Sequence, residues 1–94
     1  MTRIIVKELV WDEWNKSHIS KHNVTEGEAA EAGKNLIYHR RSYDQRYLAI
    51  GRSDKRLITL IISRKGKGRY YLVTARDSDK NERRKVYEKE KQNS

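Results

Sequence analysis

The chain has no cysteine and no proline, and it has no long hydrophobic run. Without thiols it cannot form disulfides, use thiolate chemistry or hold a cysteine-ligated zinc or iron–sulfur site, and it suits a reducing cytoplasm. Apolar runs are short, as at Leu60–Ile62. We therefore expect a cytoplasmic protein with neither a signal peptide nor a transmembrane helix, and with no membrane partner.

Positive charge is what the chain has in excess, and the excess is local. Residues 34–76 contain twelve of the 22 Lys and Arg side chains but only two acids, Asp44 and Asp54, which gives this stretch a charge of +10 in a chain of net charge +9. The same stretch has the strongest strand signals. The positive field should therefore lie on or around a β-sheet, where it would attract phosphate, and nucleic acid is the leading partner.

A chain of 94 residues makes one small domain with a modest core. We expect that domain over residues 1–91, followed by a frayed tail at residues 92–94. The predicted strands are Arg3–Trp11, a short one at Leu36–His39, Arg46–Arg52, Arg56–Arg64 and Arg69–Ala75. Helices are predicted over residues 13–22, 25–33 and 79–91.

The order of these elements, β-α-α-β-β-β(-β)-α, predicts an α+β fold. The last three strands are joined by hairpin-length connections, so we expect them to be antiparallel neighbours. The sheet is therefore predicted to be antiparallel, with two helices packed on one face. The other face, or its rim, is left to solvent or to ligand, and a C-terminal helix ends the fold.

Local signals set the helix ends. Thr25 and Glu28 have the spacing of a capping box, and Gly33 is expected to stop the second helix. Trp11 and Trp14 are interpreted as core residues.

The last helix should open at Asp79, with Glu82 three residues later. Its only large apolar anchors are Val86 and Tyr87. We therefore expect it to dock weakly or to need a partner.

The arginines follow the strands. Arg46 and Arg52 bracket one strand, Arg56 and Arg64 bracket the next, and Arg76 follows the third in phase with its even-numbered residues. Forked guanidinium groups at strand ends form a plausible phosphate clamp. The alternative is that strand-end arginines only keep sheet edges soluble. For the whole cluster the clamp is favoured, since solubility does not require such an imbalance.

Tyrosines are interleaved with these cations. Tyr47, Tyr70 and Tyr71 could stack on unpaired bases, but tyrosine is also an ordinary strand residue. Stacking and core packing are equally supported.

His18 and His22 stand four residues apart, the spacing of a helical metal pair, but no third ligand is evident. We expect no metal and no other cofactor. His22, beside Lys21, is more interesting as a general acid or an anion contact. The alternative for His22 is a helix-terminal residue that bonds nearby carbonyls.

Several segments, spread over about residues 10–88, resemble BrnT-type toxins. They are Trp11-Asp12, Lys21-His22-Asn23-Val24-Thr25, Glu28-Ala29-Ala30, Tyr47-Leu48-Ala49-Ile50-Gly51-Arg52, Thr74-Ala75-Arg76 and Glu82-Arg83-Arg84 with Tyr87. The resemblance implies a RelE-like fold and a ribonuclease toxin of a type II toxin–antitoxin pair. It further implies a partner, a BrnA-like antitoxin of the ribbon-helix-helix type, in a hetero-oligomer that represses its own operon. The resemblance does not assign roles to single residues.

The sequence hypothesis is a metal-independent endoribonuclease in which the ribose 2′-OH attacks the adjacent phosphate. The predicted catalytic residues are His22, Arg52, Arg64 and Arg76, and the predicted RNA-binding residues are Lys21, Arg46, Tyr47, Arg56 and Tyr71. The alternative is a non-catalytic nucleic-acid-binding module, or a degenerate toxin that still binds its antitoxin. A domain that binds only an acidic protein partner is a third possibility.

Overall fold

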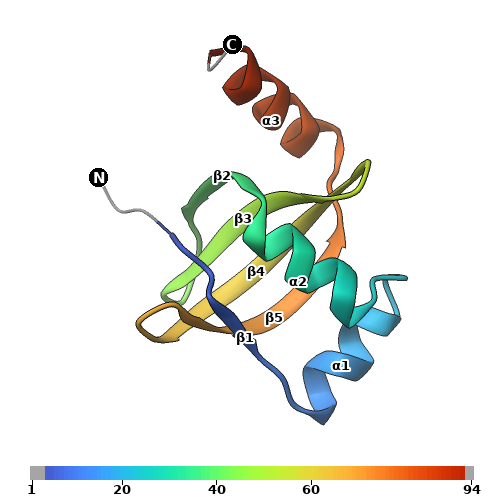
Figure 1. Ribbon diagram of the computed structural model, residues 1–94, viewed down its shortest axis with the longest axis vertical. Coiled ribbons are helices and arrows are strands. Elements are labelled where there is room, and N and C mark those ends of the chain that lie inside the picture. The colour runs from blue at the N-terminus through green and yellow to red at the C-terminus, as the bar shows by residue number, and fades with distance from the viewer. Residues whose placement is uncertain (1–3, 93–94) are drawn as a thin grey trace.

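A five-stranded mixed sheet with three helices forms the domain (Figure 1). The computed structural model describes residues 4–92. In chain order the elements are β1 (Glu8–Val10), α1 (Glu13–Ser20), α2 (Glu26–Lys34), β2 (Leu36–Arg41), β3 (Arg46–Ser53), β4 (Arg56–Gly66), β5 (Arg69–Asp77) and α3 (Lys80–Gln92). The strand order across the sheet is β1-β5-β4-β3-β2. The predicted α+β class is confirmed, as are the three antiparallel neighbours β3, β4 and β5.

The first strand is shorter than predicted, and it changes the type of the sheet. Instead of Arg3–Trp11, only Glu8–Val10 pairs, and it runs parallel to β5. The prediction of a wholly antiparallel sheet is therefore wrong. Arg3 and the tail residues 93–94 lie outside the described residues, while Gln92 ends α3.

The main core lies between one sheet face and the helices α1 and α2. Alternate residues of the central strand β4, such as Ile58, Leu60 and Ile62, are fully buried there against α1 and α2 residues such as Ile19 and Ala29. Both helices begin with the capping boxes that satisfy their free amides, and the Thr25–Glu28 box is the predicted one. No helix among the described residues is long and apolar enough to cross a membrane.

Two local predictions about the helices are wrong. Gly33 does not stop α2, because the helix continues to Lys34 and buries Gly33 against Val6 and Leu60. Trp14 is not in the core, since its residue is 55% exposed. Helical periodicity turns the face of α1 that holds Ile19 inward, and Trp14 lies outside that stripe.

A second, smaller apolar cluster occupies the opposite face of the sheet, beneath α3. It contains Leu48, Ile50, Leu57 and, from the helix, only Val86. The residues of β3 therefore alternate between the two cores. Val86 is buried as predicted, but Tyr87, the second predicted anchor of α3, is exposed, so the apolar anchorage of the helix is smaller than expected.

A bulge in β5 changes which residues share a face. The register shifts between Ile61 and Ile62, so Leu72 lies in the main core whereas Thr74 pairs with Ile61 on the other face. Arg76 therefore lies on the α3 side and is not in phase with Leu72 as predicted. A bulge adds one residue to one strand and cannot be read from period-two alternation.

Gly51 marks the closest approach between α2 and the sheet. A Cβ atom at this position would lie 2.0 Å from the carbonyl oxygen of Ala32. Gly27, in the first turn of α2, is exposed, and a Cβ atom there would lie 3.9 Å from Thr25 Oγ1, an ordinary contact distance.

We expect Gly51→Ala to destabilise the domain by about 1–3 kcal/mol or more, because backbone must move to admit the methyl group. Gly27→Ala, the matched control, should be neutral or stabilise by up to about 1 kcal/mol, because alanine favours helix. Urea unfolding followed by circular dichroism measures both. Equal effects of the two substitutions would contradict this account of the packing.

Candidate nucleic-acid interface

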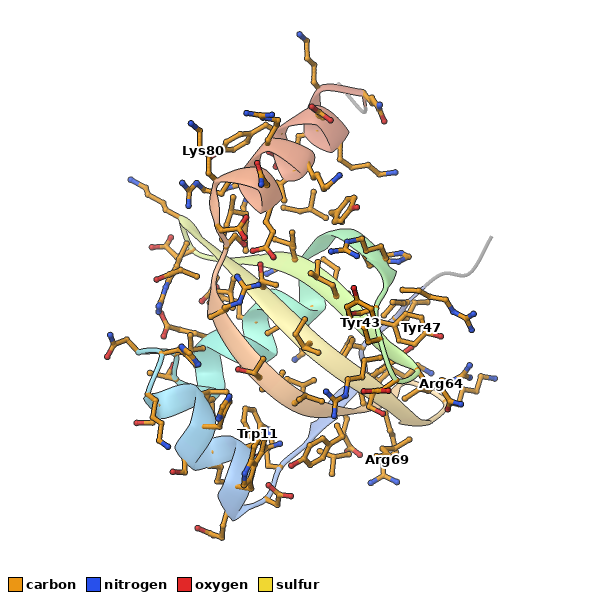
Figure 2. The ribbon with its side chains drawn as sticks, turned by 180° about the vertical axis from the view of Figure 1, so that it is seen from behind. Trp11, Tyr43, Tyr47, Arg64, Arg69 and Lys80 are labelled. Atoms are coloured by element: carbon orange, nitrogen blue, oxygen red, sulfur yellow. The ribbon has the colours of Figure 1, made fainter. Side chains whose placement is uncertain are left out.

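A groove lined by cations lies at the end of the sheet where the β2–β3 and β4–β5 turns meet. It consists of two hollows of about 250 and 410 Å³ that share Tyr47 and Arg64. We call it the cationic groove. Its lining cations are Lys7, Arg41, Arg46, Arg64 and Lys67. Figure 2 shows Tyr43, Tyr47, Arg64 and Arg69 at this end of the sheet, away from Lys80, where α3 begins.

The β2–β3 turn presents one wall of the groove. Its central residues Asp44 and Gln45 both adopt the left-handed conformation, with φ of 55° and 60°. Two such residues suit a tight hairpin, because their twist matches that of the strands. The amide of Arg46 donates to the Tyr43 carbonyl at 3.0 Å, and Tyr43 itself is 87% exposed.

The β4–β5 turn brings Lys7 to the other wall. The Gly68 carbonyl accepts hydrogen bonds from the amides of Lys7 and Glu8 at 2.9 and 3.1 Å. Gly68 has a φ of 76°, and a Cβ atom there would lie 2.8 Å from the Lys7 side chain. Only glycine relieves both constraints.

The cations of the groove are not neutralised by the protein. Within residues 4–92, ion pairs join Arg52 to Glu90, Arg56 to Glu28 and Asp77, Arg69 to Glu8, and Arg76 to Glu82. None of the five groove cations takes part in these pairs. The Arg64 side chain makes only a long hydrogen bond, 3.5 Å, to the Gly66 carbonyl. The groove can therefore offer its full positive charge to a phosphate chain.

Arg52 and Arg76, two of the predicted catalytic residues, hold α3 instead. One nitrogen of Arg52 donates to both Glu90 oxygens at 2.8 and 2.9 Å, and Arg76 forms a two-pronged pair with Glu82 at the same distances. Arg64 lies on the other face of the sheet, opposite Tyr70. The predicted convergence of these three arginines does not occur.

Glu82 is the polar centre of the α3 contact. It is buried, and it also accepts hydrogen bonds from Thr59 Oγ1 and from the amide of Asp79. Burial alone would raise the pKa of Glu82, but the bonds from Arg76, Asp79 and Thr59 outweigh it and lower the pKa overall. The helix-opening role predicted for Asp79 and Glu82 is confirmed by their reciprocal hydrogen bonds.

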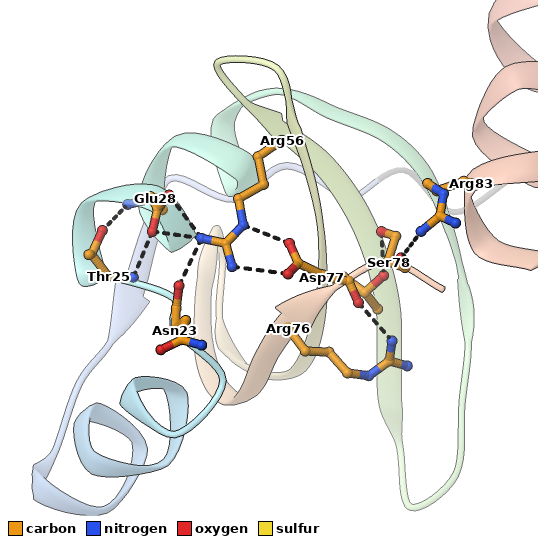
Figure 3. A network of polar contacts seen from close by, with 9 residues as sticks. Asn23, Thr25, Glu28, Arg56, Arg76, Asp77, Ser78 and Arg83 are labelled. Carbon is orange, nitrogen blue, oxygen red and sulfur yellow. Dashed lines mark hydrogen bonds and ion pairs between the residues drawn. The ribbon is translucent and has the colours of Figure 1, made fainter. Parts of the chain in front are cut away.

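Arg56, predicted to bind RNA, is a structural clamp (Figure 3). Its guanidinium donates to both oxygens of Asp77 in β5, to both oxygens of Glu28 in α2 and to the Asn23 carbonyl. Asn23 has a left-handed φ of 58° between the two helices. Arg56 thus fastens the α1–α2 turn and the start of α2 to the sheet, and its donors are used internally.

Tyr71 lies beside the groove rather than in it. Tyr71 and Arg46 flank Ser63 across three strands, and Lys65 Nζ lies 5.9 Å from the Tyr71 ring centre. The Tyr71 hydroxyl donates to Asp12 at 3.0 Å. Burial, then Asp12, raises the Tyr71 pKa. The ring edge is therefore fixed by the cap of α1.

His22 and Lys21 follow α1 and do not line the cationic groove. Both are exposed. His22 meets His18 edge-on at 5.4 Å between ring centres, and His18 stacks on Trp14 at 4.7 Å. Among residues 4–92 no group of three or more His, Cys, Asp or Glu side chains could hold a metal ion.

Of the nine predicted site residues, the groove lining contains Arg46, Tyr47 and Arg64. Sequence reasoning missed Lys7, Arg41 and Lys67. Lys67 lies in the predicted connection between the last two strands, and this placement could have identified it. Arg41 follows the predicted strand Leu36–His39, where no turn was predicted. No sequence pattern indicated Lys7, because its place in the groove is set by a backbone hydrogen bond to Gly68, 61 positions away.

No protein-family model, curated protein or solved structure matches this chain. The geometry of the groove and the chemistry of its side chains therefore carry the functional argument.

We expect Arg56→Met to lower the free energy of unfolding by about 1 kcal/mol at pH 7, because partly exposed ion pairs are screened by water. The pKa of Glu28 is lowered by the Thr25 amide and then by Arg56, and that of Asp77 by Arg56. Lowered carboxyl pKa values stabilise the fold above the unfolded value, about pH 4, and this contribution is lost as pH falls through the lower folded values. Urea titrations at pH 7 and near pH 2 should show a larger deficit of the variant at pH 7 than near pH 2, where only the hydrogen bond from Arg56 to the uncharged Asn23 carbonyl is lost. A deficit of equal size at both pH values would rule out the ion pairs as its cause.

Proposed function

We propose that this protein binds single-stranded RNA in the cationic groove. The observation that carries the proposal is a contrast between arginines of the sheet. Arg52, Arg56, Arg69 and Arg76 have carboxylate partners, whereas Arg46 and Arg64 form no ion pair among residues 4–92. Unpaired cations along a groove follow a phosphate backbone and release its counterions. The exposed Tyr43 and the half-buried Tyr47 offer ring surfaces for unstacked bases, which favours a single strand over a duplex.

The double variant Arg46→Ala/Arg64→Ala should bind a fluorescein-labelled oligouridine more weakly. The slope of log affinity against log salt concentration is negative, because salt weakens binding. If each arginine contacts one phosphate, the magnitude of this slope should decrease by about 1.4, or about 0.7 for each lost contact. Fluorescence anisotropy over a salt series measures both quantities.

The matched control is Lys16→Ala/Lys55→Ala, which removes the same net charge at exposed positions away from the groove. It should change affinity little and leave the slope near the wild-type value. If both double variants behave alike, net charge and not the groove governs binding.

Cleavage of the bound RNA is a second proposal, supported by the resemblance to BrnT-type toxins and by the unpaired state of Arg64. In this reaction the 2′-OH loses its proton and attacks the adjacent phosphorus, the bond to the 5′ oxygen breaks, and that oxygen gains a proton. The products are a 2′,3′-cyclic phosphate and a 5′-hydroxyl. Arg46 and Arg64 would stabilise the charge of the phosphorane. A RelE-like ancestry and neutralisation by a BrnA-like antitoxin belong to the same proposal.

Incubation of the protein with labelled RNA in EDTA tests cleavage separately from binding. We expect cyclic-phosphate products, and Arg64→Ala should reduce the rate by about 10²–10³. His22→Ala should cleave at the wild-type rate, because His22 lies outside the groove. If the protein binds the RNA but does not cleave it, the binding proposal stands and the cleavage proposal is wrong.

A further inference from the structure

One edge of the sheet is open and long enough to accept another strand. Among residues 4–92, β2 is the last strand of the sheet on this side and pairs only with β3. After a register shift between Leu36 and Tyr38, the pairing is regular from Tyr38 to Arg41. The outer edge of such a strand presents unpaired amide and carbonyl groups, which pair readily with a further strand. The opposite edge, β1, offers only three residues.

A groove of about 420 Å³ runs between this edge and α3. It is bordered by three consecutive residues of β2, Ile37, Tyr38 and His39. Ile37 and Tyr38 both pack against the cluster beneath α3, because the register shift lies between Leu36 and Tyr38. His39 pairs with Ala49 of the main core and so points to the other face. A groove bordered by both Tyr38 and His39 therefore lies along the edge of the strand. The other wall is a stripe of α3 at helical spacing that includes Lys85, Glu88 and Lys89.

The net charge of this groove is positive, because the other acidic residues of α3 form ion pairs with arginines of the sheet. Glu82 and Glu90 bind Arg76 and Arg52 on the sheet, which leaves only Glu88 facing Lys85 and Lys89. Lys85 lies over the ring of Tyr38, with its Nζ 5.9 Å from the ring centre. The pKa of the half-buried His39 is lowered by burial and then by Lys89.

We propose that the β2 edge is a docking site for an extended acidic segment of a partner protein, which adds to the sheet as a sixth strand beside α3. Backbone hydrogen bonds to β2 would supply affinity, and carboxylates facing Lys85 and Lys89 would supply selectivity. A protein segment fits better than RNA, because only a peptide backbone can continue a strand ladder. A second copy fits less well, because each chain has a net charge of +9 and its own edge ends in Arg40 and Arg41.

Selection from a phage library of random dodecapeptides against the purified protein tests the docking site. We expect enriched peptides to be acidic and free of proline at alternate positions. Amide hydrogen exchange of the complex with the best peptide should show new protection among residues 36–41. The pKa of His39 should rise towards its ordinary value, because added carboxylates offset Lys89.

The double variant Lys85→Glu/Lys89→Glu should lower the affinity for the selected peptide by about tenfold or more, because two attractive charges become repulsive ones. The control Lys16→Glu/Lys55→Glu makes the same charge change elsewhere and should leave affinity within about twofold. RNA binding to the cationic groove should persist in the Lys85/Lys89 variant, so the two proposals fail separately. Failure to enrich acidic peptides, or enrichment of peptides that protect only the cationic groove, would overturn the proposal.

Discussion

The pairing of arginines with carboxylates decides which positive charges this protein can offer to a ligand. The guanidinium groups of Arg52, Arg56 and Arg76 donate hydrogen bonds to carboxylates of a helix or of a neighbouring strand. The Arg56 pairs add to the apolar core that already holds α2, whereas the Arg52 and Arg76 pairs hold α3, where apolar contact is limited. Arg46 and Arg64, which form no ion pair among the described residues, lie at the end of the sheet that carries the cationic groove. The proposed RNA-binding surface depends on this separation of paired and unpaired arginines.

Carboxylate placement also shapes the α3 side of the molecule. The helix is highly charged, yet Glu82 and Glu90 face inward and leave its outer stripes basic. Val86 is its single buried apolar side chain. The helix is therefore attached mainly by directional polar contacts, and its position beside β2 creates a second groove with a character different from the first. One groove is defined by side-chain cations, and the other by an open backbone edge.

Much of the secondary structure could be predicted because its signals are local. Capping at Thr25 and Glu28, the apolar run of β4 and the hairpin-length turns depend on residues close in sequence. Of the predicted site residues, Arg46, Tyr47 and Arg64 line the cationic groove, and their binding of RNA stays a prediction. The predicted common clamp of Arg52, Arg64 and Arg76 was wrong, because parity along separate strands does not reveal how β3, β4 and β5 are registered, and the bulge near Thr74 moved Arg76 to the other face.

The sequence alone determined an α+β domain with an unneutralised surplus of positive charge in its strand region, since composition and short-range patterns suffice for that. Only the tertiary structure decided which cations remain free. Ion pairing joins residues such as Arg52 and Glu90, which are 38 positions apart, and it depends on strand register and helix docking to within a few ångströms. Those distances follow from the packing of the whole chain and have no counterpart in any single segment.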